Sequence, residues 1–367
     1  MEKVQLKNIC RPKQWKTLTG KNLVPDGKYP VYGANGIIGY YNDYNHENET
    51  LMIGCRGTCG ALNISQPFSY INGNAMALDD LVDDIDIRYL YYALMGRGFQ
   101  DVISGAVQPQ IIRADLEKME VWIGNKKEQK EIVDVFSKLD TVLSHRKREI
   151  QYLDDLIKAR FVELFGNPVL NDKGWVQKSL GEITTKIGSG ATPKGGKEAY
   201  QEDGITLIRS MNVHNGQFEY KDLAHISDEQ AAKLDNVTIE VNDVLLNITG
   251  ASVARSCVVP VKVLPARVNQ HVCIIRCKDC IIPEFLNKLL IDDNYQDLLW
   301  GIAGSGATRE AITKQQVEGL QIIMPPIELQ REFMVFCKQV DKSKVAVQAA
   351  LDKAQLLFNS LMQEYFG

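Results

Sequence analysis

The sequence has no apolar run long enough to span a bilayer, and its first residues lack the charged and then apolar pattern of a secretory signal. Cysteine is scarce: eight cysteines are scattered along 367 residues and form no framework of regular spacings. Scattered thiols suit a reducing compartment. These absences predict a cytoplasmic protein without membrane segments. With 45% apolar and 24% charged residues, the chain is long enough for two or three domains.

Residue clusters that carry catalysis are missing as well. The loop Gly188–Lys197 resembles a phosphate-binding loop, but Ala191 occupies the place of a required glycine, and Glu198 replaces the Ser/Thr that would hold magnesium. The five histidines have no metal-ligand spacing, and the Asn/Asp-Pro-Pro-aromatic motif of amino-methyltransferases is absent. We therefore predict a binding component that is not an enzyme and holds neither cofactor nor metal.

Three cysteines leave one enzymatic alternative open. Cys273, Cys277 and Cys280 have the spacing of the cluster ligands in radical S-adenosylmethionine enzymes, which would make the chain an iron–sulfur enzyme. Such a cluster needs its three thiolates on one loop, whereas Cys273 and Cys277 lie in an alternating, strand-like segment. Buried structural thiols are the favoured interpretation.

The charge of the chain does not by itself indicate a nucleic-acid partner. There are 42 Lys and Arg against 46 Asp and Glu, which gives a net charge of −4 and counts against a protein that coats DNA without specificity. The charges are uneven, however, because the first 28 residues hold seven Lys/Arg and only two acidic residues. A local basic face of this kind can still bind phosphate.

An internal repeat is the strongest signal in the sequence. At an offset of 201 residues, Ser104-Gly-Ala aligns with Ser305-Gly-Ala, and the match continues without a gap to the pair Gly166 and Gly367. Upstream, Thr50–Gly57 resembles Asp243–Gly250 at an offset of 193, and Leu6–Ile9 resembles Leu180–Ile183 at 174. The second copy is therefore longer near its start by 201 minus 174, or 27 residues. The chain is predicted to be two copies of one plan, a variable domain followed by a long helix.

The two helices are predicted over 125–166 and 325–367. Asn125 and Glu128 form a capping-box pattern at the start of the first, and Pro325-Pro326 precedes the second. Apolar residues then recur at alternating spacings of four and three, typical of a coiled coil rather than of two separate surface helices. These seam positions are Ile132, Phe136, Leu139, Leu143, Ile150, Leu153, Ile157 and Leu164 in the first helix, and Phe333, Cys337, Val340, Val347, Leu351, Ala354, Phe358 and Tyr365 in the second. At about 1.5 Å per residue, each helix would be about 60 Å long.

The remaining segments, 1–124 and 167–324, are predicted to be mixed α/β domains. Strand-like runs such as Thr238–Leu246 and His271–Ile275 alternate with turns rich in Gly and Asn, and Tyr89–Leu94 and Glu284–Ile291 have helical patterns. The predicted fold class is α/β (α+β): two such domains separated by two long antiparallel coiled-coil helices, with an internal pseudo-two-fold repeat.

Several motifs give the chain a specific resemblance to the specificity subunits of type I restriction–modification systems. They are Ser104–Ile111 with Asp115-Leu116, Pro325–Gln330, Ile187–Pro193, Gly204–Asn212, Tyr32–Gly39 and Asn269–His271. The similarity extends over the whole chain and makes the two α/β domains target-recognition domains. Two departures are that the first helix opens with Gly124-Asn125-Lys126 instead of Pro-Pro, and that the first domain is short.

The resemblance implies a sequence-specific subunit that reads a bipartite, asymmetric site in double-stranded DNA. In this family two methyltransferase subunits, which use S-adenosylmethionine, dock on the helices, and motor-nuclease subunits, which use ATP and Mg²⁺, complete the restriction enzyme. The chain itself would supply no catalysis. The alternative within DNA-binding proteins is an orphan regulator or scaffold without a methyltransferase partner.

Loops that present Arg, Asn and Gln to base edges, and Lys, Ser and Thr to phosphates, should read the DNA. The candidates in the first domain are Tyr32, Asn35, Arg56, Gln108 and Gln110. Those in the second domain are Ser189, Thr192, Lys194, Arg209, Arg255, Asn269, Gln270 and Arg309.

Overall fold

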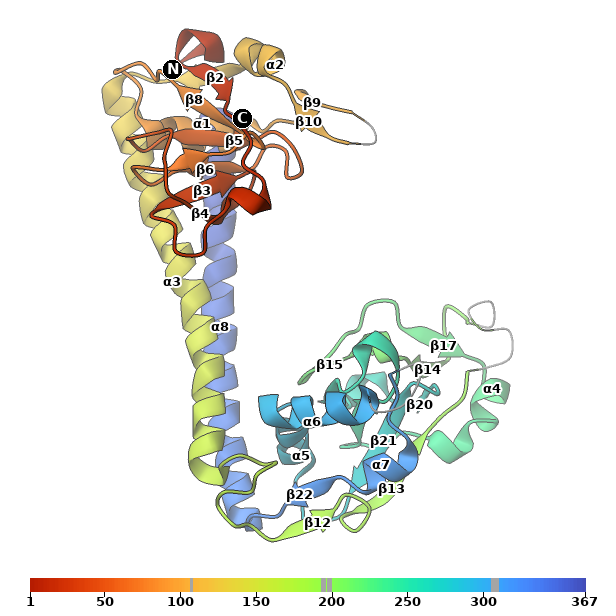
Figure 1. The fold of residues 1–367 in the computed structure, drawn as a ribbon. Coiled ribbons are helices and arrows are strands. Elements are labelled where there is room, and N and C mark those ends of the chain that lie inside the picture. The colour runs from red at the N-terminus through yellow and green to blue at the C-terminus, as the bar shows by residue number, and fades with distance from the viewer. Residues whose placement is uncertain (106–107, 193–195, 197–199, 305–309) are drawn as a thin grey trace. The chain divides into compact units, whose positions relative to one another are not determined.

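The computed structural model describes the chain except residues 106–107, 193–195, 197–199 and 305–309 (Figure 1). It divides into two compact units, Met1–Glu149 with Val347–Gly367, and Ile150–Ala346. Each unit thus contains one α/β domain and a part of both long helices. Among the described residues, no helix combines the length and the apolar character needed to cross a membrane.

The first unit is built on two small sheets. A four-stranded antiparallel sheet has the order β2-β8-β5-β6, and a three-stranded sheet has the order β4-β3-β7, with β3 and β7 parallel. The strands are β2 (Arg11–Gln14), β3 (Tyr29–Gly33), β4 (Gly36–Tyr41), β5 (Leu51–Gly54), β6 (Leu62–Ile64), β7 (Tyr70–Ile71) and β8 (Ala75–Asp79). Two antiparallel pairs complete the unit: β1 (Glu2–Gln5) with β11 (Glu120–Ile123), and β9 (Ile103–Ser104) with β10 (Gln110–Ile111).

The second unit repeats this plan. Its sheets have the orders β13-β21-β18-β19 and β17-β14-β20, with β14 and β20 parallel, and β12 pairs with β22. The strands are β12 (Gln177–Ser179), β13 (Thr184–Ser189), β14 (Ile205–Ile208), β17 (Ala224–Ile226), β18 (Val244–Asn247), β19 (Ser256–Val258), β20 (Ala266–Val268), β21 (Val272–Cys277) and β22 (Gln321–Ile323). The orders and the strand directions match those of the first unit one for one, so the duplication seen in the sequence is also a duplication of topology.

The extra residues of the second copy enlarge two connections. The β3–β4 connection is the short turn Ala34–Asn35, whereas β14 and β17 are joined through the hairpin β15 (Val213–His214) and β16 (Gln217–Phe218). The connection from β17 to β18 holds α4 (Asp228–Ala232). The insertion therefore leaves the sheets unchanged.

Both faces of the four-stranded sheets are buried, because successive side chains of a strand point to opposite faces. In β5, Leu51 and Ile53 pack in the core that includes α1 (Ile87–Arg97) and the long helices, whereas Met52 faces the second sheet. In β18, Val244 and Leu246 face the helical core and Leu245 faces the other sheet. Short helices close the helical side: α2 (Arg113–Lys118), α5 (Pro283–Leu290), α6 (Asp293–Gly304) and α7 (Lys314–Glu318).

One predicted strand is wrong in its first half. Thr238–Leu246 was expected to be extended, but the strand β18 begins only at Val244. Glu240 and Asp243 form a turn before it, in which the Glu240 amide donates to Asp243 Oδ2 at 2.7 Å and Asn242 has a φ of 69°. Hydrogen bonds between an Asp side chain and a nearby backbone amide favour such a turn over the extended chain.

The two long helices are α3 (Lys126–Phe165) and α8 (Ile327–Phe366). They run antiparallel within each unit: Phe136 of α3 contacts Phe358 and Phe366 of α8 in the first, and Phe161 and Phe165 contact Phe333 in the second. The predicted cap of α3 is confirmed, because the Glu128 amide donates to Asn125 Oδ1 at 3.0 Å and the Asn125 amide to Glu128 Oε2 at 2.8 Å.

Charged residues occupy gaps in the apolar seam of the second unit. Lys344, which interrupts the seam of α8, lies 2.5 Å from Asp154 Oδ1 of α3. Arg160, at a vacant seam position of α3, lies 2.9 Å from Glu332 Oε1 of α8. Both ion pairs are partly exposed, so each contributes little to the free energy of unfolding. Their main effect is to favour one register of α3 against α8.

A repeated buried glutamine attaches each helix to its own domain. Gln129, 3% exposed, accepts from the Asp86 amide at the start of α1 and donates to the Gly124 carbonyl. Gln330, 0% exposed, accepts from the Ile282 amide at the start of α5 and donates to the Pro325 carbonyl. Each glutamine side chain thus forms hydrogen bonds with backbone groups of two different segments. These groups are buried, where leaving them without a hydrogen bond would destabilise the fold.

Candidate nucleic-acid interface

In the second unit, four strands end at one short loop, Asn269–His271, which joins β20 to β21. Ser189 at the end of β13 pairs with Cys273, and Asn247 at the end of β18 pairs with Val272. Ile208 at the end of β14 pairs with Val268. The antiparallel and parallel pairings therefore gather polar loop residues at one end of both sheets, where recognition loops are commonly placed.

Asn269 holds this loop together. Its amide donates to the Ile208 carbonyl at 3.1 Å, its Oδ1 accepts from the His271 amide at 3.0 Å, and its carbonyl accepts from the Gly190 amide at 3.1 Å. The side chain is 5% exposed. The structure thus gives Asn269 an internal role, where the sequence predicted a contact with DNA.

Side chains beside Asn269 form a chain of hydrogen bonds. His271 Nδ1 lies 2.5 Å from Thr249 Oγ1, and His271 Nε2 lies 3.2 Å from Gln270 Nε2. Gln270 Oε1 in turn accepts from Thr192 Oγ1. Gln270, Thr192 and Ser189 are exposed, so three of the predicted residues share one polar surface at the ends of the strands.

Two of the three predicted arginines of this unit, Arg209 and Arg255, flank the same region. The Arg209 guanidinium lies over the Tyr200 ring, 5.3 Å from its centroid, and Nη2 donates to the Asp222 carbonyl. Arg255 is half-buried, and its carbonyl accepts from the Asn247 amide at 2.8 Å. Asn247 is fully buried, and its Oδ1 accepts no hydrogen bond from the residues that the structure describes. Lys194 and Arg309, also predicted, lie outside the described residues.

The first unit has an equivalent loop, Asn72–Asn74, between β7 and β8, which the sequence analysis missed. The Asn72 amide donates to the Tyr32 carbonyl at 2.9 Å, as the Asn269 amide does to Ile208. Asn72 Oδ1 accepts from Gly73 and Leu18 amides at 2.7 and 3.1 Å. A signal was present, because Asn72 precedes Asn269 by 197 residues, between the offsets of 193 and 201 of the flanking repeats.

The predicted residues of the first unit divide into one buried and four exposed side chains. Tyr32 is 6% exposed in the core, and its hydroxyl accepts from the Gln66 amide at 3.1 Å, so it supports the fold instead of offering a surface. Arg56 follows β5 and forms an isolated bridge with Gln110. Asn35, Arg56, Gln108 and Gln110 are exposed. Arg56 and Gln110 are thus brought together by the backbone.

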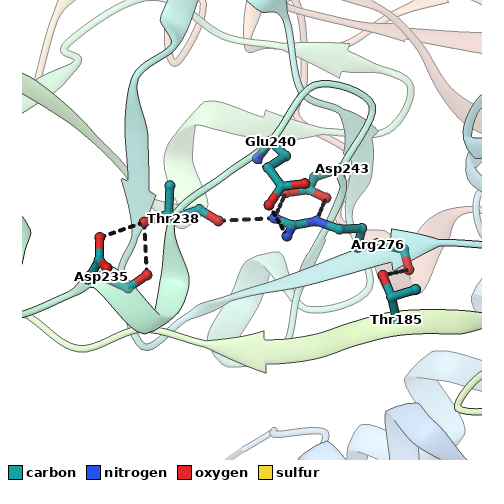
Figure 2. Close-up of polar contacts among 6 residues, drawn as sticks. All are labelled: Thr185, Asp235, Thr238, Glu240, Asp243 and Arg276. Carbon is teal, nitrogen blue, oxygen red and sulfur yellow. Dashed lines mark hydrogen bonds and ion pairs between the residues drawn. The ribbon is translucent and has the colours of Figure 1, made fainter.

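An ion cluster lies at the other end of β18 and β21 (Figure 2). Arg276 donates from Nε to Asp243 Oδ1 at 2.8 Å and from Nη2 to Asp243 Oδ2 at 2.9 Å, a bidentate pair. The same guanidinium contacts Glu240 and the Thr238 carbonyl. The Asp243 side chain is fully buried, and the hydrogen bonds that Arg276 donates to it raise the pKa of Arg276. The cluster joins β18 to β21, and Thr249 and His271 lie just beyond the opposite end of these two strands.

The three cysteines of the iron–sulfur alternative do not assemble into a site. Cys273 and Cys277 lie on β21, and burial raises the pKa of each thiol to about 12, which disfavours the thiolate that a cluster requires. Cys280 is exposed, contrary to the expectation of a buried thiol. Within the described part of the chain, no group of three or more His, Cys, Asp or Glu side chains could hold a metal ion.

Comparisons with known proteins agree with this arrangement. The family model described as "Type I restriction modification DNA specificity domain" matches residues 1–152 and 172–354. A putative type I restriction enzyme specificity subunit of Haemophilus influenzae is 22% identical over 356 residues, covering 93% of this chain and 84% of that protein. The EcoprrI specificity subunit of Escherichia coli is 26% identical over 115 residues, which span 31% of this chain but only 28% of that protein.

The fold also resembles a solved structure. The S subunit of a type I restriction–modification system from M. genitalium aligns over 100% of this chain and 96% of that chain, with a TM-score of 0.63 and 17% identity. At this identity the likeness extends to the fold alone.

Proposed function

The chain belongs to the family of type I restriction–modification DNA specificity domains, and we propose that it reads a bipartite, asymmetric sequence in double-stranded DNA. It is a non-catalytic specificity subunit, and the family match over both copies favours this role over an orphan regulator. Each copy reads one half-site. We assign target recognition to residues 1–124 and 167–324, and spacing to the helices over 125–166 and 325–367.

The observation that carries the proposal is the loop built twice at the ends of equivalent strands. Asn72 and Asn269 hold it in the same way, through an amide donated to the strand that pairs in parallel. The exposed residues around it differ: Asn35, Arg56 and Gln110 in one copy, and Ser189, Thr192 and Gln270 in the other. One scaffold with two sets of polar side chains suits the reading of two different half-sites.

The long helices offer surfaces for partner subunits. Leu356, 71% exposed, and Val142, 42% exposed, leave apolar area uncovered in the first unit, as does Val345, 71% exposed, in the second. Apolar side chains exposed on a helix that already has its seam packed favour a second contact. Two methyltransferase subunits dock here, supplying S-adenosylmethionine chemistry, and motor-nuclease subunits with ATP and Mg²⁺ join them. The complex works in the cytoplasm, where its DNA substrate is.

Two steps test the proposal. The chain is co-purified with the methyltransferase encoded by the adjacent gene, and the methylated adenines in the DNA are then mapped by sequencing. We expect a complex that methylates one two-part motif with a fixed spacer. Substituting Val345→Glu and Leu356→Glu together should abolish co-purification, whereas Val261→Glu, which changes a residue 64% exposed outside the two long helices, should not. A chain that binds a two-part site but retains no methyltransferase would be an orphan regulator, and methylation without a two-part motif would refute the reading function.

A further inference from the structure

The Gln270 amide is held by two neighbours that use, among the residues the structure describes, only half of its hydrogen-bonding capacity. A glutamine amide has two N–H donors and a carbonyl oxygen with two lone pairs. Gln270 Nε2 lies 3.2 Å from His271 Nε2, and Gln270 Oε1 accepts from Thr192 Oγ1. One donor and one acceptor are therefore used.

The His271 ring is itself held in place. Because Gln270 Nε2 can only donate, His271 Nε2 accepts, and the ring proton is then on Nδ1, which lies 2.5 Å from Thr249 Oγ1. Thr249 follows β18 and is bridged to Ala311, so the ring is attached to the framework of the unit. Gln270 is exposed, but its amide is oriented before any ligand arrives.

A free N–H beside a free carbonyl lone pair is the complement of adenine in the major groove. Adenine presents N7 as an acceptor and N6–H as a donor, and a glutamine amide binds both at once. Guanine presents two acceptors there, cytosine a donor, and thymine an acceptor and a methyl group, so none of them matches both atoms. Since the loop Asn269–His271 lies where the strands end, the Gln270 side chain lies among the other exposed loop residues.

From this geometry we infer that Gln270 reads one adenine of the half-site recognised by the second domain, with His271 and Thr192 as positioning residues. The inference rests on the proposed function. The equivalent position of the first domain is Gly73, where a Cβ would lie 2.4 Å from Thr17 Oγ1 and 2.6 Å from the Trp15 carbonyl. The loop Asn72–Asn74 therefore offers no such side chain at this position, and we assign the contact to the half-site of the second domain only.

The test uses the complex of the full chain with its methyltransferase subunits and duplexes of the mapped motif. Each adenine in turn is replaced by 7-deazaadenine, which lacks the N7 acceptor, and the dissociation constant is measured. For the wild type, we expect about a tenfold loss of affinity at one adenine of one half-site, because one hydrogen bond is removed and its donor is left unpaired. For Gln270→Ala, the loss at that position should disappear, while the losses at other positions remain.

Three variants separate base reading from a structural effect. Gln270→Ala should reduce discrimination against other base pairs at that position by about 5- to 150-fold. Gln270→Glu removes the donor and should shift the preference there toward cytosine, whose N4 amino group donates. His271→Ala should reduce the 7-deazaadenine loss at the same position only. Gln177→Ala, at an exposed glutamine of β12, is the matched control and should change none of these values.

A 7-deazaadenine loss that persists unchanged in Gln270→Ala, or the lack of any position where the wild type suffers such a loss, would overturn the inference. In either case the two-part motif and its methylation would remain intact. Failure of the proposed function differs, because no two-part motif would then be found at all.

Discussion

Replacing Arg276 by methionine should destabilise the second unit strongly, because it leaves a buried carboxylate without its counter-ion. The Asp243 side chain is 0% exposed and the Arg276 side chain 21% exposed. The change removes both charge-assisted bonds to Asp243, and among the described residues only the Glu240 amide, 2.7 Å from Oδ2, still donates to it. Removing one partner of a buried ion pair costs about 3–5 kcal/mol. Because Arg276 is partly exposed, we expect about 3 kcal/mol.

This magnitude is large enough to measure by two methods. A loss of about 3 kcal/mol lowers Tm by about 6–12 °C for a unit of this size. Hydrogen exchange followed by mass spectrometry resolves the two units, and the peptides of β18 and β21 should exchange faster while those of β5 and β8 do not change. Asp243→Asn in the Arg276→Met background should restore part of the loss, since it removes the unpaired charge.

Arg88→Met is the matched control. Arg88 forms an ion pair with Glu49 at 3.2 Å, but their side chains are 50% and 41% exposed. Exposed pairs contribute about 0–1 kcal/mol, so this variant should unfold almost as the wild type does. If Arg276→Met costs no more than Arg88→Met, the ion cluster does not hold β18 and β21 together, and the reasoning is wrong.

Three further outcomes are expected. Arg209→Ala should weaken discrimination by about 1–3 kcal/mol at the second half-site alone; equal losses at both half-sites in a binding assay would mean that Arg209 acts on the scaffold. The purified chain without partners should neither methylate nor cleave DNA, and activity that survives removal of every trace of methyltransferase would contradict a non-catalytic subunit. Inserting one heptad in α3 after Leu143 and one in α8 after Ala350 keeps the seam. Phe136 contacts Phe358, and because the helices are antiparallel, the point one heptad after Phe136 in α3 is level with the point one heptad before Phe358 in α8. About 10 Å of added helix should lengthen the unspecified spacer by about one to three base pairs, as methylation mapping would show; an unchanged spacer would rule out the helices as the ruler.

The helices and the duplication could be predicted from the sequence because their signals are local or strictly periodic. The capping residues Asn125 and Glu128 are three positions apart, and the apolar spacing of four and three reports the seam directly. The observed bounds, Lys126–Phe165 and Ile327–Phe366, follow these patterns closely. The gap-free offset of 201 residues likewise requires no knowledge of the fold.

The candidate site could be predicted only in part. Polar residue types in loops pointed to Gln270, Thr192 and Arg56, which are exposed near the ends of strands. The same reasoning selected Tyr32 and Asn269, which the structure buries. Residue type indicates that a side chain can form hydrogen bonds, but not whether its partners are DNA or the backbone of a neighbouring strand.

The sequence alone therefore determined the family, the repeat and the helical seam, because all three are carried by short motifs and by constant spacings along the chain. Only the tertiary structure decided which polar side chains are exposed and which are buried. The loop Asn72–Asn74 is joined to Tyr32, and Asn269 to Ile208, through pairings between segments about 40 to 60 residues apart, and the register of those strands sets the burial of each side chain. The Arg276–Asp243 cluster likewise exists only because β18 and β21 are neighbours in the sheet. Interactions between distant segments depend on the packing of the whole unit, and no local pattern encodes them.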